Sequence, residues 1–399
     1  DRLKKLAESA IGDHNHLKER RGFETRKLKK KVPLTDCFIA PCTEGCPIGQ
    51  DIPEYIRLAG EKRYLEALEV IVSKNPLPFI TGILCNHRCT SKCTRLDCDE
   101  AVRIREVKLL TARNGFEKLL ENMQTPAITS DCKAAVVGGG PAGLSAAYFL
   151  ARNGVDVTVF EKRKEPGGVI RYVAPNFRIS RQDVDNDLAI IRKAGVKFGL
   201  GADPDFSVKK LREQGYQYIF IAVGAWKPGN LKLDPCDRKP LNVLEFLEKY
   251  NEGHDPKDGS CDYTGSVDKT AVQTEPVLKP GKSVAVVGAG NSAMDAARAA
   301  KRLRGVENVA ILYRRTKEYM PADREERDLA LREGVEFREL LSPVSYANGI
   351  LRCQKMTLGA PDDSGRRSPV AMEGEFVDVK ADMVISAVGE RVDTGPFIK

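Results

Sequence analysis

Two short segments near the N-terminus concentrate thiols that could bind metal. "CFIAPCTEGCP" begins at residue 37 and "CNHRCTSKC" at residue 85, with one more cysteine soon after in "RLDC". A cysteine, three residues, a second cysteine and a proline match the end of the bacterial ferredoxin pattern, in which thiolates hold iron-sulfur clusters. The candidate metal ligands are therefore Cys37, Cys42, Cys46, Cys85, Cys89, Cys93 and Cys98.

Zinc and a metal-free region are the alternatives for these thiols. Four thiolates also form a tetrahedral zinc site, but zinc fingers usually place paired cysteines on short β-hairpins, whereas this region shows helical spacing. Structural disulfides are not expected, because the sequence begins "DRLKKLAES", without the apolar core of a signal peptide, and cytosolic thiols stay reduced. We expect iron-sulfur clusters and a cytoplasmic protein.

A glycine-rich turn follows the thiols and predicts a dinucleotide site. The strand "AAVVG" leads into "GGGPAG", a helix follows, and an acidic residue comes at the end of the next strand, "VDVTVFEK". The glycines of such a unit allow a tight turn, close approach of a pyrophosphate and helix packing, and the carboxylate accepts hydrogen bonds from both ribose hydroxyls. The site should hold FAD or NAD(H). The residues concerned are Gly138, Gly140, Pro141, Ala142, Gly143 and Glu161.

The same arrangement recurs about 150 residues later, with a different residue type after its second strand. "SVAVVGAGNSAMDAARAAKRL" carries Gly288, Gly290 and Ala293 at the corresponding places, and "NVAILYRR" ends in Arg314 and Arg315. Guanidinium groups there suit the extra ribose phosphate of NADP(H), so NADPH is favoured over NADH. The sequence leaves open which arginine would bind it.

Two different nucleotides imply electron transfer through a flavin. NADPH can deliver hydride to FAD, and flavin can pass electrons singly to iron-sulfur centres. No Cys-x2-Cys pair occurs in the chain, so a redox disulfide of the thioredoxin reductase kind is not expected. The sequence predicts an NAD(P)H-dependent iron-sulfur flavoprotein oxidoreductase, an electron-input module that passes electrons from NADPH through FAD to 4Fe-4S clusters and on to a catalytic domain or partner subunit.

Two other functions compete with this hypothesis. One is a degenerate flavoprotein scaffold with a role in assembly. The other is a NAD-dependent dehydrogenase that acts directly on a small substrate, but the chain offers no evident acid-base constellation, and its histidines are scattered at His14, His16, His87 and His254.

The elements that must position these residues suggest an α/β protein with a helical head. Residues 1–130 show apolar spacing of three and four and predict a helical iron-sulfur domain. Short apolar runs then alternate with helical stretches, which predicts two Rossmann-like domains: an FAD-binding domain over 131–255 and an NAD(P)H-binding domain over 256–386. From about residue 387 the chain is expected to return to the FAD domain.

The composition is that of a globular chain without a membrane span. The net charge is +8, and the basic segment 18–31 contains few aromatic residues for base stacking, so nucleic acid is not expected as a partner. The longest apolar runs are far shorter than the roughly 20 residues that a transmembrane helix needs. The chain ends on an apparent strand and turn, which suggests a piece of a longer polypeptide.

These motifs together resemble a known family. "GGGPAGLSAAYFLARNG", "EKRKEPGG", "APNFRISRQDV", "GAGNSAMDAARAA" and "YRRTKEYMPADREE", after a cysteine-rich helical region, resemble the small subunit of NADPH-dependent glutamate synthase and the N-terminal half of dihydropyrimidine dehydrogenase. The likeness is strongest to the iron-sulfur flavoprotein subunit named for selenate reductase. It implies other domains of a longer chain, or a catalytic oxidoreductase subunit, as partners.

The resemblance also implies how the thiols divide between two 4Fe-4S clusters. One would be held by Cys37, Cys42 and Cys93, and the other by Cys46, Cys85 and Cys89. Two family ligands are replaced here, by Leu34 and Lys108, which leaves each cluster one ligand short. Cys98 is one candidate for a missing ligand and Glu106 a weaker one; the alternatives are a residue outside this chain, a water or a three-iron cluster, with Cys98 as a bystander.

The remaining expectations from the family concern the nucleotides. Lys162, Gly167 and Gly168 should lie beside the flavin, and Asn291, Ser292 and Asp295 should line the helix at the NADPH site. Family members also close the flavin site with a later strand that this chain does not contain.

Overall fold

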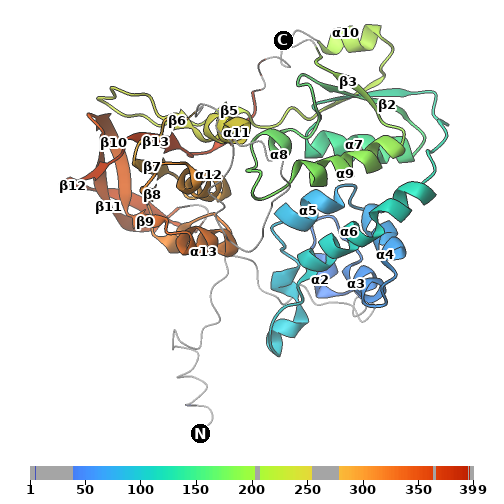
Figure 1. The fold of residues 1–399 in the computed structure, drawn as a ribbon, viewed down its shortest axis with the longest axis horizontal. Coiled ribbons are helices and arrows are strands. Elements are labelled where there is room, and N and C mark those ends of the chain that lie inside the picture. Colours follow the sequence, from blue (N-terminus) through green and yellow to red (C-terminus); the bar gives the residue numbers. More distant parts are fainter. Residues whose placement is uncertain are drawn as a thin grey trace.

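The computed structural model describes residues 5, 39–202, 207–253, 278–362, 365–393 and 395. Cys37 and Leu34 lie outside these residues. Figure 1 shows three parts: a helical region at the lower right, a parallel sheet with its helices above it, and a second parallel sheet at the left. The mixed α/β fold predicted from the sequence is confirmed.

The helical region follows the apolar spacing of its sequence. α3 buries Ile52, Tyr55 and Leu58 on one side, and the Asp51 carboxylate caps it by accepting from the Glu54 amide at 3.4 Å. The apolar spacing continues into α4, but the helix is interrupted between α3 and α4, where Lys62 has a φ of 60°. The helices and 3-10 turns are α2 (Pro41–Gly45), α3 (Ile52–Gly60), α4 (Tyr64–Val72), α5 (Pro78–Leu84), η2 (Thr90–Lys92), η3 (Thr94–Asp97) and α6 (Ile104–Asn122).

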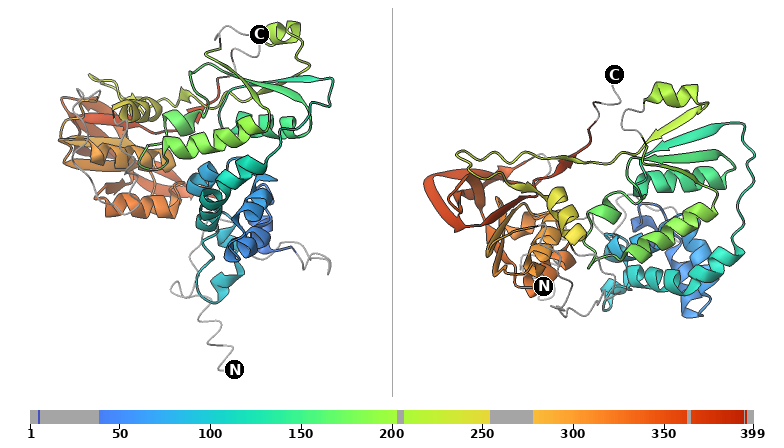
Figure 2. Two further views of the ribbon diagram at one scale, coloured as in Figure 1. Left: turned by 45° about the vertical axis from the view of Figure 1, so that its right-hand side comes forward. Right: turned by 45° about the horizontal axis from the view of Figure 1, so that its top comes forward.

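The first parallel sheet has the strand order β3-β2-β1-β4. Its core is continuous with that of the helical region, because residues from Ile52 to Val196 form one buried cluster. Figure 2 shows the helical region packed beneath the helices of this sheet. The elements are β1 (Lys133–Val137), α7 (Pro141–Arg152), β2 (Asp156–Glu161), α8 (Val169–Tyr172), α9 (Arg181–Lys193), β3 (Lys197–Leu200), α10 (Val208–Glu213) and β4 (Tyr218–Ile221).

The second parallel sheet repeats this topology. Its order, β6-β13-β7-β8-β9, places β7, β8, β9 and β13 as β1, β2, β3 and β4 are placed in the first sheet. The elements are β6 (Leu241–Asn242), α11 (Val243–Gly253), β7 (Ser283–Val287), α12 (Asn291–Arg302), β8 (Asn308–Tyr313), η4 (Lys317–Tyr319), α13 (Arg324–Arg332), β9 (Glu336–Glu339) and β13 (Met383–Ser386).

The two copies differ in what covers the other face of each sheet. In the second copy, β10 (Leu341–Ala347), β11 (Ile350–Pro361) and β12 (Arg367–Lys380) form an antiparallel sheet that buries Tyr346, Leu351 and Val379 against β7, β8 and β13. In the first copy α10 packs there with Leu211, and Tyr218 on β4 stays 62% exposed. This antiparallel sheet was not among the elements predicted from the sequence.

The segment that joins the two sheets runs beside the segment that follows the second sheet. β5 (Lys227–Pro228) follows the first sheet and β14 (Glu390–Arg391) follows the second, and the two pair antiparallel. The Gly229 amide donates to the Gly389 carbonyl at 2.6 Å.

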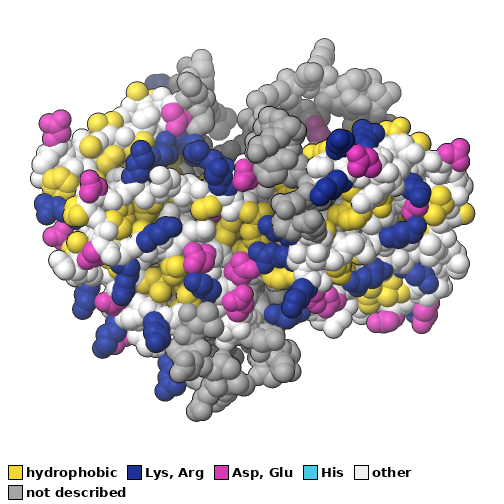
Figure 3. Space-filling model, turned by 90° about the horizontal axis from the view of Figure 1, so that it is seen from above, with side chains coloured by type: hydrophobic (Ala, Val, Ile, Leu, Met, Phe, Trp, Pro, Cys, Tyr) yellow, Lys and Arg dark blue, Asp and Glu magenta, His cyan; other side chains and the backbone are white. Residues whose placement is uncertain are grey.

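The surface seen in Figure 3 carries intermingled Lys, Arg, Asp and Glu side chains. Among the helices described, none combines the length and the apolar content that a membrane crossing requires.

Candidate nucleotide and iron-sulfur sites

The first glycine turn is built so that only glycine fits at two of its positions. Gly138 has a φ of 107°, and a Cβ there would lie 2.4 Å from the Ala222 carbonyl oxygen. A Cβ at Gly143 would lie 2.0 Å from the Gly138 carbonyl oxygen, because α7 begins directly against the turn. The nearest atom to a Cβ built on Gly140 is the Gly168 Cα, at 3.9 Å, so a ligand can approach the Gly140 backbone.

Glu161 lies at the mouth of this turn. It is 7% exposed, and its carboxylate accepts from the Gly139 amide at 2.8 Å and from the Arg163 amide at 2.9 Å. Each of these two bonds holds one oxygen of the Glu161 carboxylate, and both oxygens keep a lone pair for a further donor.

The segment with two successive glycines closes the turn from the other side. The Gly167 amide donates to the Gly139 carbonyl at 2.7 Å, and a Cβ at Gly168 would lie 2.8 Å from the Gly140 Cα. Lys162 is exposed, with its ammonium 6.0 Å from the centre of the Trp226 ring. The structure therefore brings together the residues that the sequence assigned to the flavin, including Pro141 and Ala142 at the start of α7.

The second glycine turn has the same construction. Gly288 has a φ of 136°, and a Cβ there would lie 2.1 Å from the carbonyl oxygen of Ala387, which follows β13 as Ala222 follows β4. No atom lies within 4 Å of a Cβ built on Gly290, so this turn is open to a ligand. Ala293 is fully buried in the helix packing.

The strand register shows which residue of the second copy corresponds to Glu161. Val137 pairs with Phe160 in the first sheet and Val287 pairs with Leu312 in the second, so Tyr313 takes the place of Glu161. The arginines follow at the two next positions. The sequence predicted an arginine at the position that Glu161 has in the first copy. The register instead places the uncharged Tyr313 there.

The two arginines have different surroundings. Arg315 is 7% exposed, donates to the Arg367 carbonyl at 2.8 Å and pairs with Asp362 at 2.9 Å, which ties it to the antiparallel sheet. Arg314 is exposed and forms no hydrogen bond or ion pair with the residues that the structure describes. Only Arg314 is free to bind a ligand phosphate without breaking an existing ion pair.

Asn291 and Asp295 of α12 contact protein groups rather than open space. The Asn291 side-chain oxygen accepts from the Asp323 amide at 2.8 Å. Asp295 is 8% exposed and accepts two bonds from the Arg178 guanidinium, at 2.6 and 2.8 Å. Ser292 lies between them, half-buried.

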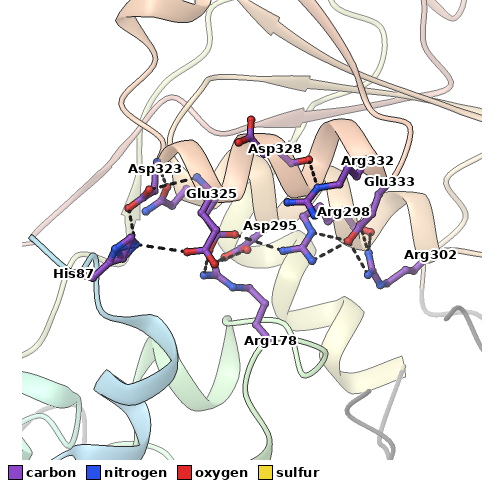
Figure 4. Close-up of polar contacts among 12 residues, drawn as sticks. His87, Arg178, Asp295, Arg298, Arg302, Asp323, Glu325, Asp328, Arg332 and Glu333 are labelled. Atoms are coloured by element: carbon purple, nitrogen blue, oxygen red, sulfur yellow. Dashed lines mark hydrogen bonds and ion pairs between the residues drawn. The ribbon is translucent and has the colours of Figure 1, made fainter. Parts of the chain in front are cut away.

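Arg178 belongs to a chain of charges that joins the two dinucleotide domains (Figure 4). It also pairs with Glu326 of α13. Burial raises the pKa of Glu326 and of Asp295, although the nearby arginines oppose that rise. The remaining pairs, Arg298 with Glu326 and Glu333, and Arg302 with Glu333, continue the chain along α12 and α13.

The helical region reaches the same end of α13. Arg105 of α6 binds Glu325 through both carboxylate oxygens, at 2.9 and 2.8 Å, and also donates to the Cys85 carbonyl at 3.2 Å. The His87 Nε2 lies 3.8 Å from Asp323 and 3.5 Å from Glu325. Thus the second cysteine segment contacts the second dinucleotide domain directly.

Five of the described thiols fall into two groups by their electrostatic interactions. Cys42 on α2 interacts electrostatically with Cys93, which ends η2. Cys46, Cys85 and Cys89 lie within electrostatic range of Lys108 on α6.

The family resemblance assigns Cys42 and Cys93 to one cluster, with Cys37, which lies outside the described residues, and Cys46, Cys85 and Cys89 to the other. Cys98 is exposed beside Arg95. Glu106 is 62% exposed and pairs with Arg103, on the surface of α6.

Burial favours the neutral form of two of these thiols. Burial raises the pKa of Cys89 to about 11 and also raises the pKa of Cys42. Iron binds thiolate, so loading must release protons. Among the described residues, no three His, Cys, Asp or Glu side chains gather closely enough for a single metal ion.

The residues present fit the three groups. Both turns are open where a pyrophosphate must approach, at Gly140 and Gly290. The Ser386 hydroxyl, at the end of β13 beside the second turn, is buried with no hydrogen-bond partner among the described residues, and a nucleotide could supply one. The thiol sets supply the soft ligands of iron-sulfur clusters.

Sequence reasoning did not identify the charged residues between the domains. Arg178 stood in "APNFRIS", a segment quoted for its family likeness and assigned no role. Its partners, Asp295 and Glu326, lie 117 and 148 residues away. The available signal was a lone arginine between apolar residues, ahead of the serine that caps α9.

Comparison with known proteins agrees with this construction. Residues 132–397 match the family "Pyridine nucleotide-disulphide oxidoreductase", and residues 24–119 match "Dihydropyrimidine dehydrogenase domain II, 4Fe-4S cluster". The structure of Mycobacterium tuberculosis FprA in complex with NADPH is similar in fold, with a TM-score of 0.51, 21% identity, and coverage of 67% of this chain and 72% of that one.

Relatives in sequence cover nearly all of the chain. "Putative oxidoreductase YgfK" of Escherichia coli strain K12 is 44% identical over 396 residues, which are 99% of this chain and 36% of that protein. The chain therefore spans about a third of this relative.

A second relative is matched over most of its own length. "Glutamate synthase [NADPH] small chain" of Halomonas elongata is 31% identical over 373 residues, 90% of this chain and 75% of that one. The oxidoreductase class and the cofactors FAD, NADPH and 4Fe-4S are confirmed. The chain belongs to the pyridine nucleotide-disulphide oxidoreductase family, in which it carries an N-terminal 4Fe-4S domain and is related to the small chains of NADPH-dependent glutamate synthase.

Proposed function

We propose that this chain takes electrons from NADPH onto FAD and passes them through two 4Fe-4S clusters to a catalytic domain or partner subunit. One observation carries the proposal: two glycine turns of identical construction end in opposite charge environments. The first presents the Glu161 carboxylate, and the second presents Tyr313 and a free Arg314. Two copies of one unit with different ligands indicate a transfer between nucleotides.

Within this proposal the first turn binds FAD. The amides at the start of α7 face the pyrophosphate, and the open backbone of Gly140 lets it approach. The Glu161 carboxylate accepts from the ribose hydroxyls, while its bonds to two amides keep it oriented. FAD bound there supplies the exchange of electrons in pairs with nicotinamide and singly with iron-sulfur centres.

The second turn binds NADPH by the same backbone geometry. Arg314 takes the 2′-phosphate, because it is exposed and Tyr313 carries no charge that would repel the phosphate. Arg315 supports it by fixing the strand end to the antiparallel sheet. The chain's residues contribute positioning rather than acid-base chemistry, as hydride transfer requires.

The cysteine sets hold the two clusters in this proposal. Cys37, Cys42 and Cys93 bind one, and Cys46, Cys85 and Cys89 bind the other. Support comes from the closeness of Cys42 to Cys93 and of the other three to Lys108.

The cellular location and the partner that we propose are inferred from the chemistry of the thiols and from the relatives. A protein with many thiols that must stay reduced for iron is suited to the cytoplasm, which we propose as its location. The partner is a catalytic oxidoreductase domain or subunit, since the relatives include a chain of greater length and a small chain of a larger enzyme.

Anaerobic purification of the full-length protein tests the proposal. We expect flavin, iron and acid-labile sulfide in the isolated protein, with a visible spectrum of flavin bands over broad iron-sulfur absorption. NADPH should bleach both, and NADH should do so less effectively. Bound flavin without iron and sulfide, or clusters that NADPH does not reduce, would favour the scaffold function instead.

A further inference from the structure

Lys108 is a buried cation in the middle of the thiol region. It lies on α6 and is 6% exposed, and it forms no hydrogen bond or ion pair with any residue that the structure describes. An ammonium group removed from water is costly unless negative charge lies near it. Burial lowers the pKa of Lys108, so this side chain needs negative charge nearby to stay protonated.

The geometry of α6 directs Lys108 toward the cysteines. Arg105 lies three residues earlier on the same helical face and donates to the Cys85 carbonyl at 3.2 Å. Burial lowers the pKa of Lys108, and the groups that most oppose this shift are the nearby thiols of Cys85, Cys89 and Cys46. These three thiols are the set assigned above to one cluster.

The nearby carboxylate is already committed elsewhere. Asp187 of α9 is fully buried within electrostatic range of Lys108, but its two oxygens accept from the amides of Phe79 and Ile80, at 3.0 and 2.7 Å. The thiols are thus the groups positioned to balance the lysine charge.

We propose that Lys108 is the buried counter-charge of the 4Fe-4S cluster held by Cys46, Cys85 and Cys89, and that it favours the reduced form of that cluster. The inference rests on the proposed function, which places a cluster on these thiols. Three thiolates leave one iron without a cysteine from this set, and a protonated lysine has no lone pair with which to bind that iron.

The direction of the effect follows from charge balance. Reduction adds one electron, delivered from NADPH through FAD, and increases the negative charge of the cluster by one, with no bond broken and no proton transferred. A fixed positive charge in a buried setting stabilises the more negative state and raises the reduction potential. Lys108 thereby makes this cluster a better acceptor of electrons.

A redox titration followed by electron paramagnetic resonance tests this in the full-length protein. In Lys108→Met we expect at least a tenfold lower ratio of reduced to oxidised cluster at a fixed ambient potential, which is about 59 mV for one electron. The other cluster should keep its potential. Lys108→Arg retains the charge and should stay near the wild type, and Lys118→Met, which removes an exposed charge from the same helix, should have no effect.

Each other outcome has a defined meaning. An unchanged potential in Lys108→Met overturns the inference, and so does a new line shape or the loss of one iron, because that would make the lysine a ligand. If Lys108→Met loses the cluster while Lys108→Arg keeps it, the counter-charge role is supported; loss in both variants overturns it. A wild-type protein without clusters would refute the proposed function itself, which separates the two failures.

Discussion

At the scale of single residues, the second nucleotide site shows how two adjacent arginines divide their tasks. Arg315 is held by Asp362 and a carbonyl of the antiparallel sheet, whereas Arg314 points into solvent without a partner among the described residues. Tyr313 donates its hydroxyl to the Tyr319 carbonyl at 2.8 Å and leaves the site uncharged. Nucleotide selectivity should therefore depend mainly on Arg314.

Replacing Arg314 with alanine should weaken NADPH and spare NADH. Loss of a charge-assisted bond costs about 1.5 to 3 kcal/mol, which is roughly a tenfold or greater rise in KM for NADPH. Steady-state reduction of an artificial acceptor with each nucleotide measures this. Arg304→Ala, which removes an exposed arginine just after α12, is the matched control. Equal losses with both nucleotides would show that Arg314 does not contact the extra phosphate.

The sequence predicted the glycine positions at this scale and left the arginines undecided. The glycine positions could be predicted because the turn and the start of its helix lie within six consecutive residues. The choice between Arg314 and Arg315 depends on Asp362 and Arg367, which reach the site only after β11 and β12 have paired. Nothing in the local sequence encodes that contact.

At the scale of elements, one carboxylate from a helix of the first parallel sheet supports a helix of the cysteine region. Asp187 on α9 accepts from two amides in the first turn of α5, and Cys85 follows the end of that helix. Burial raises the pKa of Asp187 well above its usual range, although the two amides oppose that shift. The helix preceding Cys85 is thus fixed against the first sheet.

Substituting Asp187 with alanine should disturb the cysteine region more than the fold as a whole. Two buried amides would lose their acceptor, at a cost of about 1 to 3 kcal/mol each. We expect a lower midpoint in urea and a reduced iron content relative to flavin content, measured on the same preparation. Gln182→Ala on the exposed side of α9 should change neither quantity. Full iron content in Asp187→Ala would contradict the supporting role.

The charges between α12 and α13 predict a pH dependence of stability. Burial alone would raise the pKa of Glu333, but hydrogen bonds from Arg302 and Arg298 outweigh it, and the pKa lies below the usual 4.5. A lowered folded-state pKa gives stability that is present above pH 4.5 and is lost as the pH falls through the folded-state pKa.

The comparison of wild type with Glu333→Gln measures this contribution. The difference in unfolding free energy of the iron-free proteins should be about 1 kcal/mol at neutral pH, because the pair is partly exposed, and should shrink below pH 4.5. Glu336→Gln, whose carboxylate is 58% exposed, serves as the control. A difference that grows on acidification would contradict the prediction.

At the scale of the whole molecule, Arg178 joins the two dinucleotide domains. It comes from the loop before α9 and binds Asp295 on α12 and Glu326 on α13, with 14% of its side chain exposed. The sequence predicted both domains from their repeated turns. It did not predict how they meet, because this contact joins residues more than 100 positions apart.

Arg178→Met should loosen the contact between the domains. Two buried carboxylates would lose their main partner, at a cost of about 3 kcal/mol or more. Calorimetry should show the second domain unfolding earlier than the first, and the effect should be larger at pH 8 than at pH 5, since burial raises the pKa of both carboxylates. Arg324→Met, which changes a 61% exposed side chain on α13, is the control. A single unshifted transition would contradict the prediction.

The pairing of β5 with β14 has a mechanical consequence. The segment that joins the two sheets and the segment after β13 that pairs with it lie along one edge, which Figure 1 shows above α11, while α13, whose Glu326 binds Arg178, lies lower in the same view. The paired segments would act as a hinge on one side of the molecule, and the ion pairs of Arg178 would hold the other side closed. Opening would rotate the second sheet and its helices about the paired segments, and the ion pairs that Arg178 and Arg105 form with α12 and α13 would oppose it.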